Sequence, residues 1–337
     1  MKTPLADQVV VVLGASSGIG RATARAAASR RARVVVAARN EEALAAAVRE
    51  VESAGSEAIA VVTDTTSATD LEALCARAVE RFGRIDTFVV SVMVTVYAEV
   101  EQLDAEELRR VLEVNFLGRA LAYRAALPHL KRSRGTFIDV NSGLAYRGIP
   151  LQAAYCASKA AARAFFESAR TEQEKHGTGV DISLVLPGGV NTPQFDRGRQ
   201  KLGKQPQPVP PIYQPEVIAE AILHCCERPQ RELPVTWASQ KLLWGQKLSP
   251  RAGDLVLLRT GWRDQTTGEP KPVDSPDNLY ETIPGDPGAH GPFDDRAKGS
   301  SAWTQARLRL GKPGGVAALA APALAALIGY HGLTKRR

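Results

Sequence analysis

The chain has 337 residues, of which 44% are hydrophobic and 23% charged, which is the composition of a globular protein and not of a disordered one. Its length allows one large domain or two ordinary ones. Eight of the 43 basic residues, and no acidic ones, follow Asp295, so the other 35 nearly cancel the 36 acidic residues. The net charge of +7 therefore belongs to the tail, and it does not indicate a nucleic-acid-binding body.

The first residues, MKTPLADQVVVV, lack the apolar segment and small-residue cleavage site of a secretory signal. The four cysteines show neither C-x-x-C spacing nor another zinc-binding pattern. They are Cys75, Cys156, Cys225 and Cys226. We expect a cytoplasmic protein with reduced, mostly buried thiols and no metal site.

Valine-rich runs alternate with alanine-rich stretches of helical period from residue 8 to residue 237. The predicted strands are 8–13, 33–38, 57–62, 86–91, 135–141, 180–186 and 233–237. The predicted helices are 18–30, 41–53, 67–82, 104–132, 151–176 and 215–228. This alternation predicts an α/β fold in which a doubly wound parallel sheet of about seven strands is covered on both faces.

Two segments interrupt the alternation. Residues 187–213 are rich in Pro, Gly and Gln, and predict a long loop over the carboxyl edge of the sheet. Residues 264–300, rich in Pro, Gly and Asp, predict an extended or wrapping segment, and 238–262 predict a helical stretch between the two. The expected division is a nucleotide-binding and catalytic domain (1–250), a C-terminal extension (251–312) and an alanine-rich tail (313–337).

The first predicted strand ends in a glycine-rich turn. Its residues include Gly14, Ser16, Ser17, Gly18, Ile19 and Gly20. Such a turn lets the backbone approach a pyrophosphate, and the following helix N-terminus favours negative charge. Glycine spacing alone also fits a tight turn without a ligand, but its place between a buried strand and a helix favours dinucleotide binding.

Five groups of residues follow one another along the chain. They are Gly14-x-x-x-Gly18-x-Gly20, Asn115, Ser142, Tyr155-x-x-x-Lys159 and Pro187-Gly188-x-Val190-x-Thr192. As a set, they resemble the short-chain dehydrogenase/reductase family over roughly residues 7–237, and bacterial members with a C-terminal extension in particular. The resemblance implies a Rossmann-type sheet, a nicotinamide cofactor bound by all of these groups except Asn115 and Ser142, and carbonyl–alcohol chemistry.

The catalytic residues implied by the resemblance are Asn115, Ser142, Tyr155 and Lys159. Tyr155 and Lys159 share a helix face, and a nearby ammonium would lower the phenol's pKa from its usual value of about 10. Tyr155 is expected to exchange a proton with the substrate oxygen, and Ser142 to stabilise that oxygen. Lys159 is expected to bind the nicotinamide ribose, and Asn115 to hold a water that links Lys159 to solvent.

Cofactor choice depends on the end of the second predicted strand. Family members that prefer NAD usually carry an acidic residue there, whereas this chain has Ala38 followed by Arg39. An arginine can pair with a 2′-phosphate, so NADP is expected in preference to NAD, although Arg39 also fits a solvated surface residue.

Further cofactor contacts follow from the resemblance. Asp64 matches the position that contacts adenine, and Val190 and Thr192 match positions that hold the nicotinamide carboxamide. Ser17 and Arg21 are candidates for additional phosphate contacts.

One segment departs from the family. Where the family usually has Asn-Asn-Ala-Gly after the fourth strand, this chain has Val90-Ser91-Val92-Met93. Met93 adds bulk near the expected adenosine ribose. The chain is interpreted as an oxidoreductase, with a catalytically weak or inactive nucleotide-binding scaffold as the alternative.

The loop after the sixth strand carries Phe195, Leu202, Ile212 and Tyr213. These residues are consistent with a fairly apolar carbonyl or alcohol substrate, or with packing of the loop alone. By analogy with the family, residues 104–132 and 151–176 are expected to form a dimer or tetramer interface.

The tail has no charged residue from 313 to 334, a length that could cross a bilayer. Its many alanines, Pro322 and the basic residues on both sides equally fit an interfacial helix. A helix on a partner subunit and a disordered tail also remain open. Nucleic acid is not an expected partner, because the tail lacks interleaved aromatic residues beyond Trp303.

Overall fold

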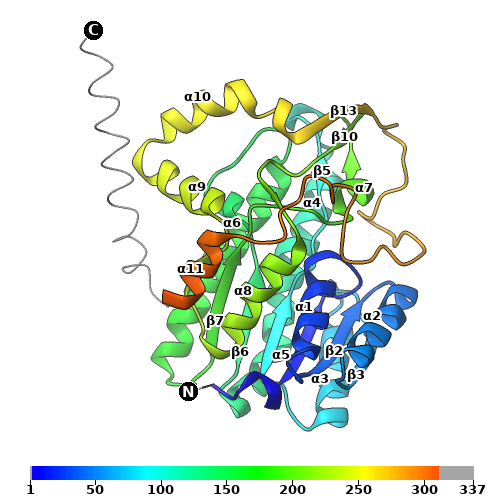
Figure 1. Cartoon of the computed structure of the whole chain (residues 1–337), viewed down its shortest axis with the longest axis vertical. Helices are drawn as coiled ribbons and strands as arrows, with labels where there is room; N and C mark the ends of the chain where they lie inside the picture. The colour runs from blue at the N-terminus through cyan, green and yellow to red at the C-terminus, as the bar shows by residue number, and fades with distance from the viewer. Residues whose placement is uncertain (1, 311–337) are drawn as a thin grey trace.

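The computed structural model describes residues 2–310, and its core is a seven-stranded parallel sheet between two layers of helices (Figure 1). The strand order is β12-β7-β6-β4-β1-β2-β3. The strands are β1 (Val9–Leu13), β2 (Arg33–Ala38), β3 (Ala58–Val62), β4 (Thr87–Val90), β6 (Thr136–Val140), β7 (Asp181–Leu186) and β12 (Glu232–Pro234). The predicted doubly wound α/β fold is confirmed.

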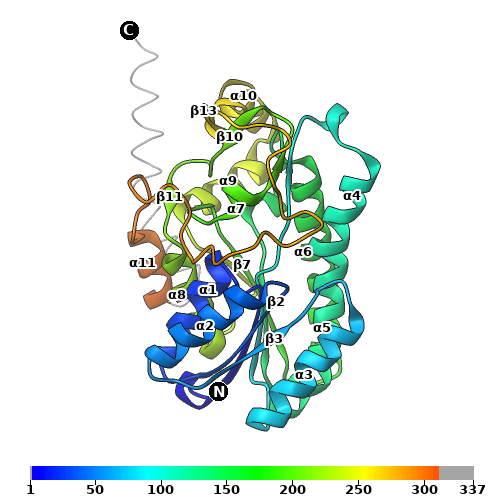
Figure 2. The ribbon, with the colours of Figure 1, turned by 90° about the vertical axis from the view of Figure 1, so that its right-hand side faces the viewer.

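Three helices cover each face of the sheet (Figure 2). One layer consists of α1 (Gly18–Ala28), α2 (Glu41–Ser53) and α8 (Pro215–Glu227), and the other of α3 (Ala68–Phe82), α5 (Gly118–Ser133) and α6 (Ala153–Lys175). Alanines on α1 allow it to pack closely against α8. The four cysteines are all buried and unpaired, as the sequence predicted.

The single helix predicted over 104–132 is divided in the structure. It consists of α4 (Ala105–Leu112), a π-helical turn (Glu113–Leu117) and α5. The side chain of Asn115, inside the π turn, accepts a hydrogen bond from Val94 N and donates one to Val94 O, both at 2.8 Å. Turns of this kind occur frequently at functional sites.

Two further boundaries differ from the prediction. The strand predicted over 233–237 ends at Pro234, because the Thr236 hydroxyl caps a new helix, α9 (Trp237–Leu248), by accepting from Ser239 N. The stretch 238–262 is two helices, since Ser249 caps and Pro250 begins α10 (Pro250–Thr260). Proline cannot continue the preceding helix.

The loop after β7 contains short elements, two of which pair with strands outside the loop. These are β8 (Gly189–Val190), α7 (Gln194–Arg197), β9 (Arg199–Gln200), β10 (Lys204–Pro206) and β11 (Ile212–Tyr213). Strand β9 pairs with β5 (Val96–Tyr97), β11 with β8, and β10 with β13 (Thr266–Pro270).

Residues 264–300 wrap across the carboxyl edge of the sheet, as predicted, and lead into α11 (Ala302–Leu310), which packs on α8 (Figures 1 and 2). Among residues 2–310, no helix has the length and hydropathy needed to cross a bilayer. The tail expected over 313–337 lies outside the described residues.

A buried ion pair joins α5 to the centre of the sheet. The Arg119 guanidinium donates to the carboxylate of Asp139 on β6, and the two side chains are 1% and 0% exposed. Arg119 also donates to the carbonyls of Val90 (3.2 Å) and Val92 (2.6 Å). It therefore fixes the segment in which the chain departs from the family's asparagine-rich pattern.

We expect Arg119→Met to lower the free energy of unfolding by about 3–5 kcal/mol, because Asp139 is left buried and unpaired. Urea unfolding followed by circular dichroism measures the change. The double variant Arg119→Met/Asp139→Leu should recover most of the loss. Arg77→Met, which removes an exposed pair with Glu80, is the control and should change stability by less than about 1 kcal/mol. Equal stability of Arg119→Met and the control would contradict the prediction.

Candidate active site

The glycine turn joins β1 to α1 at the carboxyl edge of the sheet. Gly14 has φ +94°, and a Cβ there would lie 2.8 Å from Val92 N. A Cβ on Gly20 would lie 2.1 Å from the carbonyl oxygen of Gly14. The turn can therefore close only with glycine at both positions, and Ser17 stands as the N-cap of α1, whose first amides point outward.

A cavity of about 180 Å³ lies beside this turn. Its lining includes Ser16, Ser17, Gly18, Ile19, Arg39, Asp64, Met93, Arg110, Thr192, Arg197, Asn278, Thr282 and Ile283. The turn, the ends of β2 and β3, and a segment from the C-terminal extension thus enclose one space. We refer to it as the groove.

Arg39 and Asp64 both line the groove, and the Arg39 guanidinium already has hydrogen-bond partners within the protein. Its guanidinium donates to the backbone carbonyls of Tyr280 (2.7 Å) and Asn278 (3.1 Å). Burial lowers the Arg39 pKa, and the charge of Asp64 opposes this. Burial raises the pKa of Asp64, but hydrogen bonds from Thr66 and the charge of Arg39 outweigh it and leave that pKa lowered.

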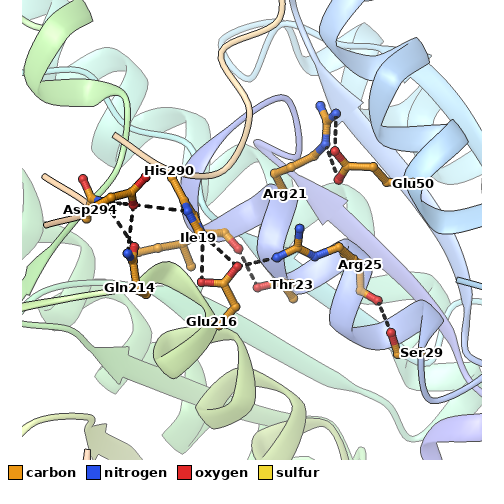
Figure 3. Close-up of polar contacts among 11 residues, drawn as sticks. Ile19, Arg21, Thr23, Arg25, Ser29, Glu50, Gln214, Glu216, His290 and Asp294 are labelled. Atoms are coloured by element: carbon orange, nitrogen blue, oxygen red, sulfur yellow. Dashed lines mark hydrogen bonds and ion pairs between the residues drawn. The ribbon is translucent and has the colours of Figure 1, made fainter. Parts of the chain in front are cut away.

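Arg21, a candidate for phosphate contact, is placed elsewhere. Its side chain is buried and donates to both carboxylate oxygens of Glu50, at 2.9 and 3.0 Å, and to Asp286. Figure 3 shows Arg21 directed toward Glu50. The sequence expectation is therefore wrong for Arg21, because these carboxylates and the carbonyl of Ala43 (2.7 Å) take up its donors.

A second cavity, of about 700 Å³, contains the expected catalytic side chains. Ser142, Tyr155 and Lys159 line it, as do Pro187, Gly188, Val190 and Thr192. The amine of Lys159 donates to the carbonyl of Val140 at 2.9 Å and lies 5.5 Å from the ring centroid of Tyr155. We refer to this cavity as the chamber.

The phenol of Tyr155 is held in its protonated form. Burial raises its pKa to about 12, opposed by the Ser142 hydroxyl and by the charge of Arg119. Burial, followed by the charge of Arg119, also lowers the pKa of Lys159 well below its usual value. The charge of Arg119, which the sequence did not point to, thus opposes the effect of burial on the Tyr155 pKa.

Asn115 lies deeper than the other three expected catalytic residues. Besides its two bonds to Val94, its amide donates to the hydroxyl of Ser158, the residue before Lys159, at 3.2 Å. It does not line the chamber, so the structure brings three of the four residues to one cavity and places the fourth behind them.

The groove and the chamber meet. Ile19, Ser91, Met93, Thr192 and Gln194 line both cavities. Met93, the bulky residue in the segment that differs from the family pattern, thus lies where the two cavities join. The two cavities therefore form one continuous space along the carboxyl edge of the sheet.

Several residues of the site were missed by sequence reasoning. Apolar side chains of α9 and α10, including Leu242, Val256 and Leu257, line the chamber, and Tyr97 lies on its wall. Of the four apolar loop residues noted in the sequence, only Phe195 lines it. The ion pair had a signal in the sequence. Asp139 lies in a predicted buried strand and Arg119 in a predicted helix, and a charged side chain at a buried position usually has a partner of opposite charge.

Comparison with known proteins supports the same assignment. The model of the short chain dehydrogenase family matches residues 8–203. An uncharacterised oxidoreductase of Bacillus subtilis, YxnA, is 35% identical over 280 residues, which cover 82% of this chain and 79% of that protein. The 11-beta-hydroxysteroid dehydrogenase A of Sesamum indicum is 35% identical over 190 residues, covering 56% of this chain and 54% of that protein.

Among solved structures, an alcohol dehydrogenase from the archaeon Thermococcus sibiricus, complexed with 5-hydroxy-NADP, matches with a TM-score of 0.58 and 29% identity. The match covers 68% of this chain and 92% of that one. The fold, the family match and these relatives agree, and the chain belongs to the short-chain dehydrogenase family as a nicotinamide-dependent oxidoreductase.

Proposed function

We propose that this chain is an NADP-dependent oxidoreductase that interconverts a ketone or aldehyde and an alcohol by hydride transfer. One observation carries the proposal: Ser142, Tyr155 and Lys159 line a single chamber that joins the groove of the glycine turn. In this proposal, residues 1–250 bind the nucleotide and carry out catalysis, and the described part of the C-terminal extension, residues 251–310, covers the site.

Each side chain has a distinct role in the proposed reaction. A bound nicotinamide supplies or accepts the hydride. Tyr155, protonated at neutral pH, gives its proton to the carbonyl oxygen during reduction and removes it during oxidation. Ser142 donates a hydrogen bond to that oxygen as negative charge develops on it. Lys159 binds the nicotinamide ribose. Asn115 donates to the hydroxyl of Ser158, the residue before Lys159, and holds a water that connects Lys159 to solvent.

The charge of the groove favours NADP over NAD. Arg39, Arg110 and Arg197 all line it, with Asp64 as the facing carboxylate. A guanidinium pairs with a 2′-phosphate, whereas a carboxylate at the end of β2 would repel it. The NADP derivative in the Thermococcus sibiricus structure is consistent with this choice.

The chamber favours a fairly apolar substrate. Its volume of about 700 Å³ lies within the range of about 300–1,000 Å³ that is typical of small-molecule sites. Ile149, Phe195, Leu242 and Val256 contribute apolar surface, and part of the space would be taken by the nicotinamide. The steroid dehydrogenase among the relatives supports a bulky carbonyl compound.

A homo-oligomer is also proposed. The exposed leucines Leu108, Leu112 and Leu117 lie on α4 and the π turn, beside α6. These are the helices that family members commonly pair, so a dimer would cover apolar side chains that the single chain leaves in water.

The alternative is a nucleotide-binding scaffold with little turnover, and Met93 at the junction of the cavities motivates it. The two functions differ in the consequence of removing the phenol. A scaffold has no need of the Tyr155 hydroxyl, whereas an oxidoreductase depends on it.

Tyr155→Phe is expected to lower turnover by at least about 100-fold while NADPH binding is retained, because the proton donor alone is removed. The assay follows NADPH absorbance with benzil, acetophenone, cyclohexanone and decanal, and NADPH binding is titrated by fluorescence. Tyr123→Phe, a buried tyrosine outside both cavities, is the matched control and should retain full activity. Wild-type turnover in Tyr155→Phe, or no turnover of any compound by the wild type, would favour the scaffold.

Arg39→Ala should weaken NADPH binding by about 10- to 100-fold, the value of a hydrogen bond between charged groups. Because Arg39 also holds the carbonyls of Asn278 and Tyr280, NADH serves as the internal control. A loss confined to NADPH assigns Arg39 to the 2′-phosphate. An equal loss for both nucleotides, measured by fluorescence titration, would contradict that role.

A further inference from the structure

Residues 277–298, here termed the strap, cross the mouth of the groove. Figure 2 shows this orange segment running above the N-terminus of α1 toward α4. Asn278, Thr282, Ile283 and Pro287 form the outer wall of the groove, opposite the glycine turn. The strap lies outside residues 8–203, which match the family model.

The strap bonds directly to the nucleotide-binding elements. Its Gly288 carbonyl accepts a hydrogen bond from Gly18 N at 3.2 Å, which is a first-turn amide of α1 of the kind that binds phosphate. The side chain of Asn40, just past Arg39, donates to the carbonyls of Ile283 and Gly285, both at 3.1 Å. Strap carbonyls therefore use donors that surround the expected position of the cofactor.

Buried apolar side chains anchor the strap near both of its ends. Leu279 lies in an apolar cluster with Val94, Val96 and Val111, and Phe293 packs with Tyr97, Phe195 and Ile212. Between these two anchors the attachment is polar: Asp286 pairs with Arg21, and His290 contacts Glu216 at 3.0 Å. Figure 3 shows His290 between Glu216 and Asp294.

This difference indicates which part of the strap can open. The exposed contact between His290 and Glu216 stabilises little, and Arg21 keeps both of its bonds to Glu50 when Asp286 moves away. Withdrawing the buried side chain of Leu279 or Phe293 costs more. Gly285 and Gly288 have φ values of +85° and +65°, and a Cβ at either would meet nothing within 4 Å. The polar middle of the strap can therefore lift while Leu279 and Phe293 stay in place.

The size of the groove makes such opening necessary. Its volume of about 180 Å³ is below the range of about 300–1,000 Å³ that is typical of small-molecule sites. The strap is hydrogen-bonded to Gly18, Arg39 and Asn40, so the adenosine half of a dinucleotide cannot enter the groove unless these bonds break.

We propose that the strap is a part of the cofactor site that holds the adenosine half of the bound dinucleotide against the glycine turn, and that lifting its middle, residues 283–290, limits cofactor exchange. The inference rests on the proposed function, because it takes the ligand to be NADP. Thr282 and Asn278 become cofactor-contacting residues that the family pattern lacks.

The test uses the full chain and stopped-flow fluorescence. NADPH dissociation is measured by a chase with excess NADP⁺, and association by direct mixing. Asp286→Ala/His290→Ala is expected to raise both rate constants about 10-fold or more, since the strap opens more often. Glu80→Ala, which removes the exposed pair with Arg77, should leave both unchanged. Wild-type rate constants in the double variant would overturn the proposed role of the strap alone. If the wild type does not bind NADPH, the cofactor assignment is overturned as well.

A second measurement needs no variant. Glu281 is exposed on the strap, and a glutamate-specific protease should cleave after it when the strap lifts. Saturating NADPH is expected to slow this cleavage about 10-fold or more, with cleavage after exposed Glu80 as the internal reference. Equal rates of cleavage after Glu281 with and without bound NADPH would contradict the proposed role of the strap in cofactor binding.

A separate observation concerns Tyr97. It is fully buried on the wall of the chamber, its ring lies 6.2 Å from that of Phe195, and its hydroxyl has no hydrogen-bond partner within residues 2–310. Burial, followed by charge on Tyr155, raises the Tyr97 pKa, so this phenol stays a neutral donor near the reacting position. An unpaired buried hydroxyl is costly, which favours a polar ligand atom as its partner.

We infer that the Tyr97 hydroxyl donates to a polar atom of the substrate and positions it for Tyr155. Tyr97→Phe should lower kcat/KM about 5- to 10-fold for the panel compound turned over fastest, chiefly through KM, without lowering Tm or changing NADPH dissociation. Tyr123→Phe, a buried tyrosine outside the chamber, is the control. Unchanged kcat/KM in Tyr97→Phe, an equal loss in Tyr123→Phe, or no turnover of any compound by the wild type would overturn this role.

Discussion

The buried ion pair between Arg119 and Asp139 organises the carboxyl edge of the sheet. The second carboxylate oxygen of Asp139 accepts from the amide of Asn141 at 2.8 Å, and that amide also reaches the carbonyl of Lys159 at 3.3 Å. The Asn141 side-chain oxygen accepts from Ser142 N at 2.9 Å. Burying two charges is costly unless further hydrogen bonds satisfy them, and here those bonds run to the backbone of Ser142 and Lys159.

The same network explains how the chain tolerates its departure from the family pattern. The segment Val90–Met93 lacks the asparagines that, in the family, tie the centre of the sheet together. Arg119 instead holds the carbonyls of Val90 and Val92, and Asn115 holds both backbone groups of Val94. The π turn places Asn115 where it can bond to this segment from the neighbouring helix. Met93 lies at the junction of groove and chamber.

Periodicity was sufficient to predict the sheet and the helices that cover it, because buried valine runs and helix faces are local properties. It did not predict the side chains of α9 and α10 that line the chamber. The sequence did not reveal what depends on distant contacts. Arg39 meets carbonyls about 240 residues later, at Asn278 and Tyr280, and nothing near Arg21 in the sequence indicates its pairing with Glu50 and Asp286. The π turn was also not predicted, because the helical pattern of apolar residues continues through Asn115 without a break.

The electrostatics of the chamber suggest how cofactor binding and proton transfer are coupled. Tyr155 and Lys159 are both buried, and burial favours the neutral form of each. The charges of Arg119 and Asp139, which lie near both residues, largely cancel. Because the chamber is shielded from water, a positive nicotinamide ring bound there would lower the Tyr155 pKa more than the same charge would in water. The phenolate needed for alcohol oxidation would then form mainly when oxidised cofactor is bound, and a strap that slows cofactor exchange would prolong that state.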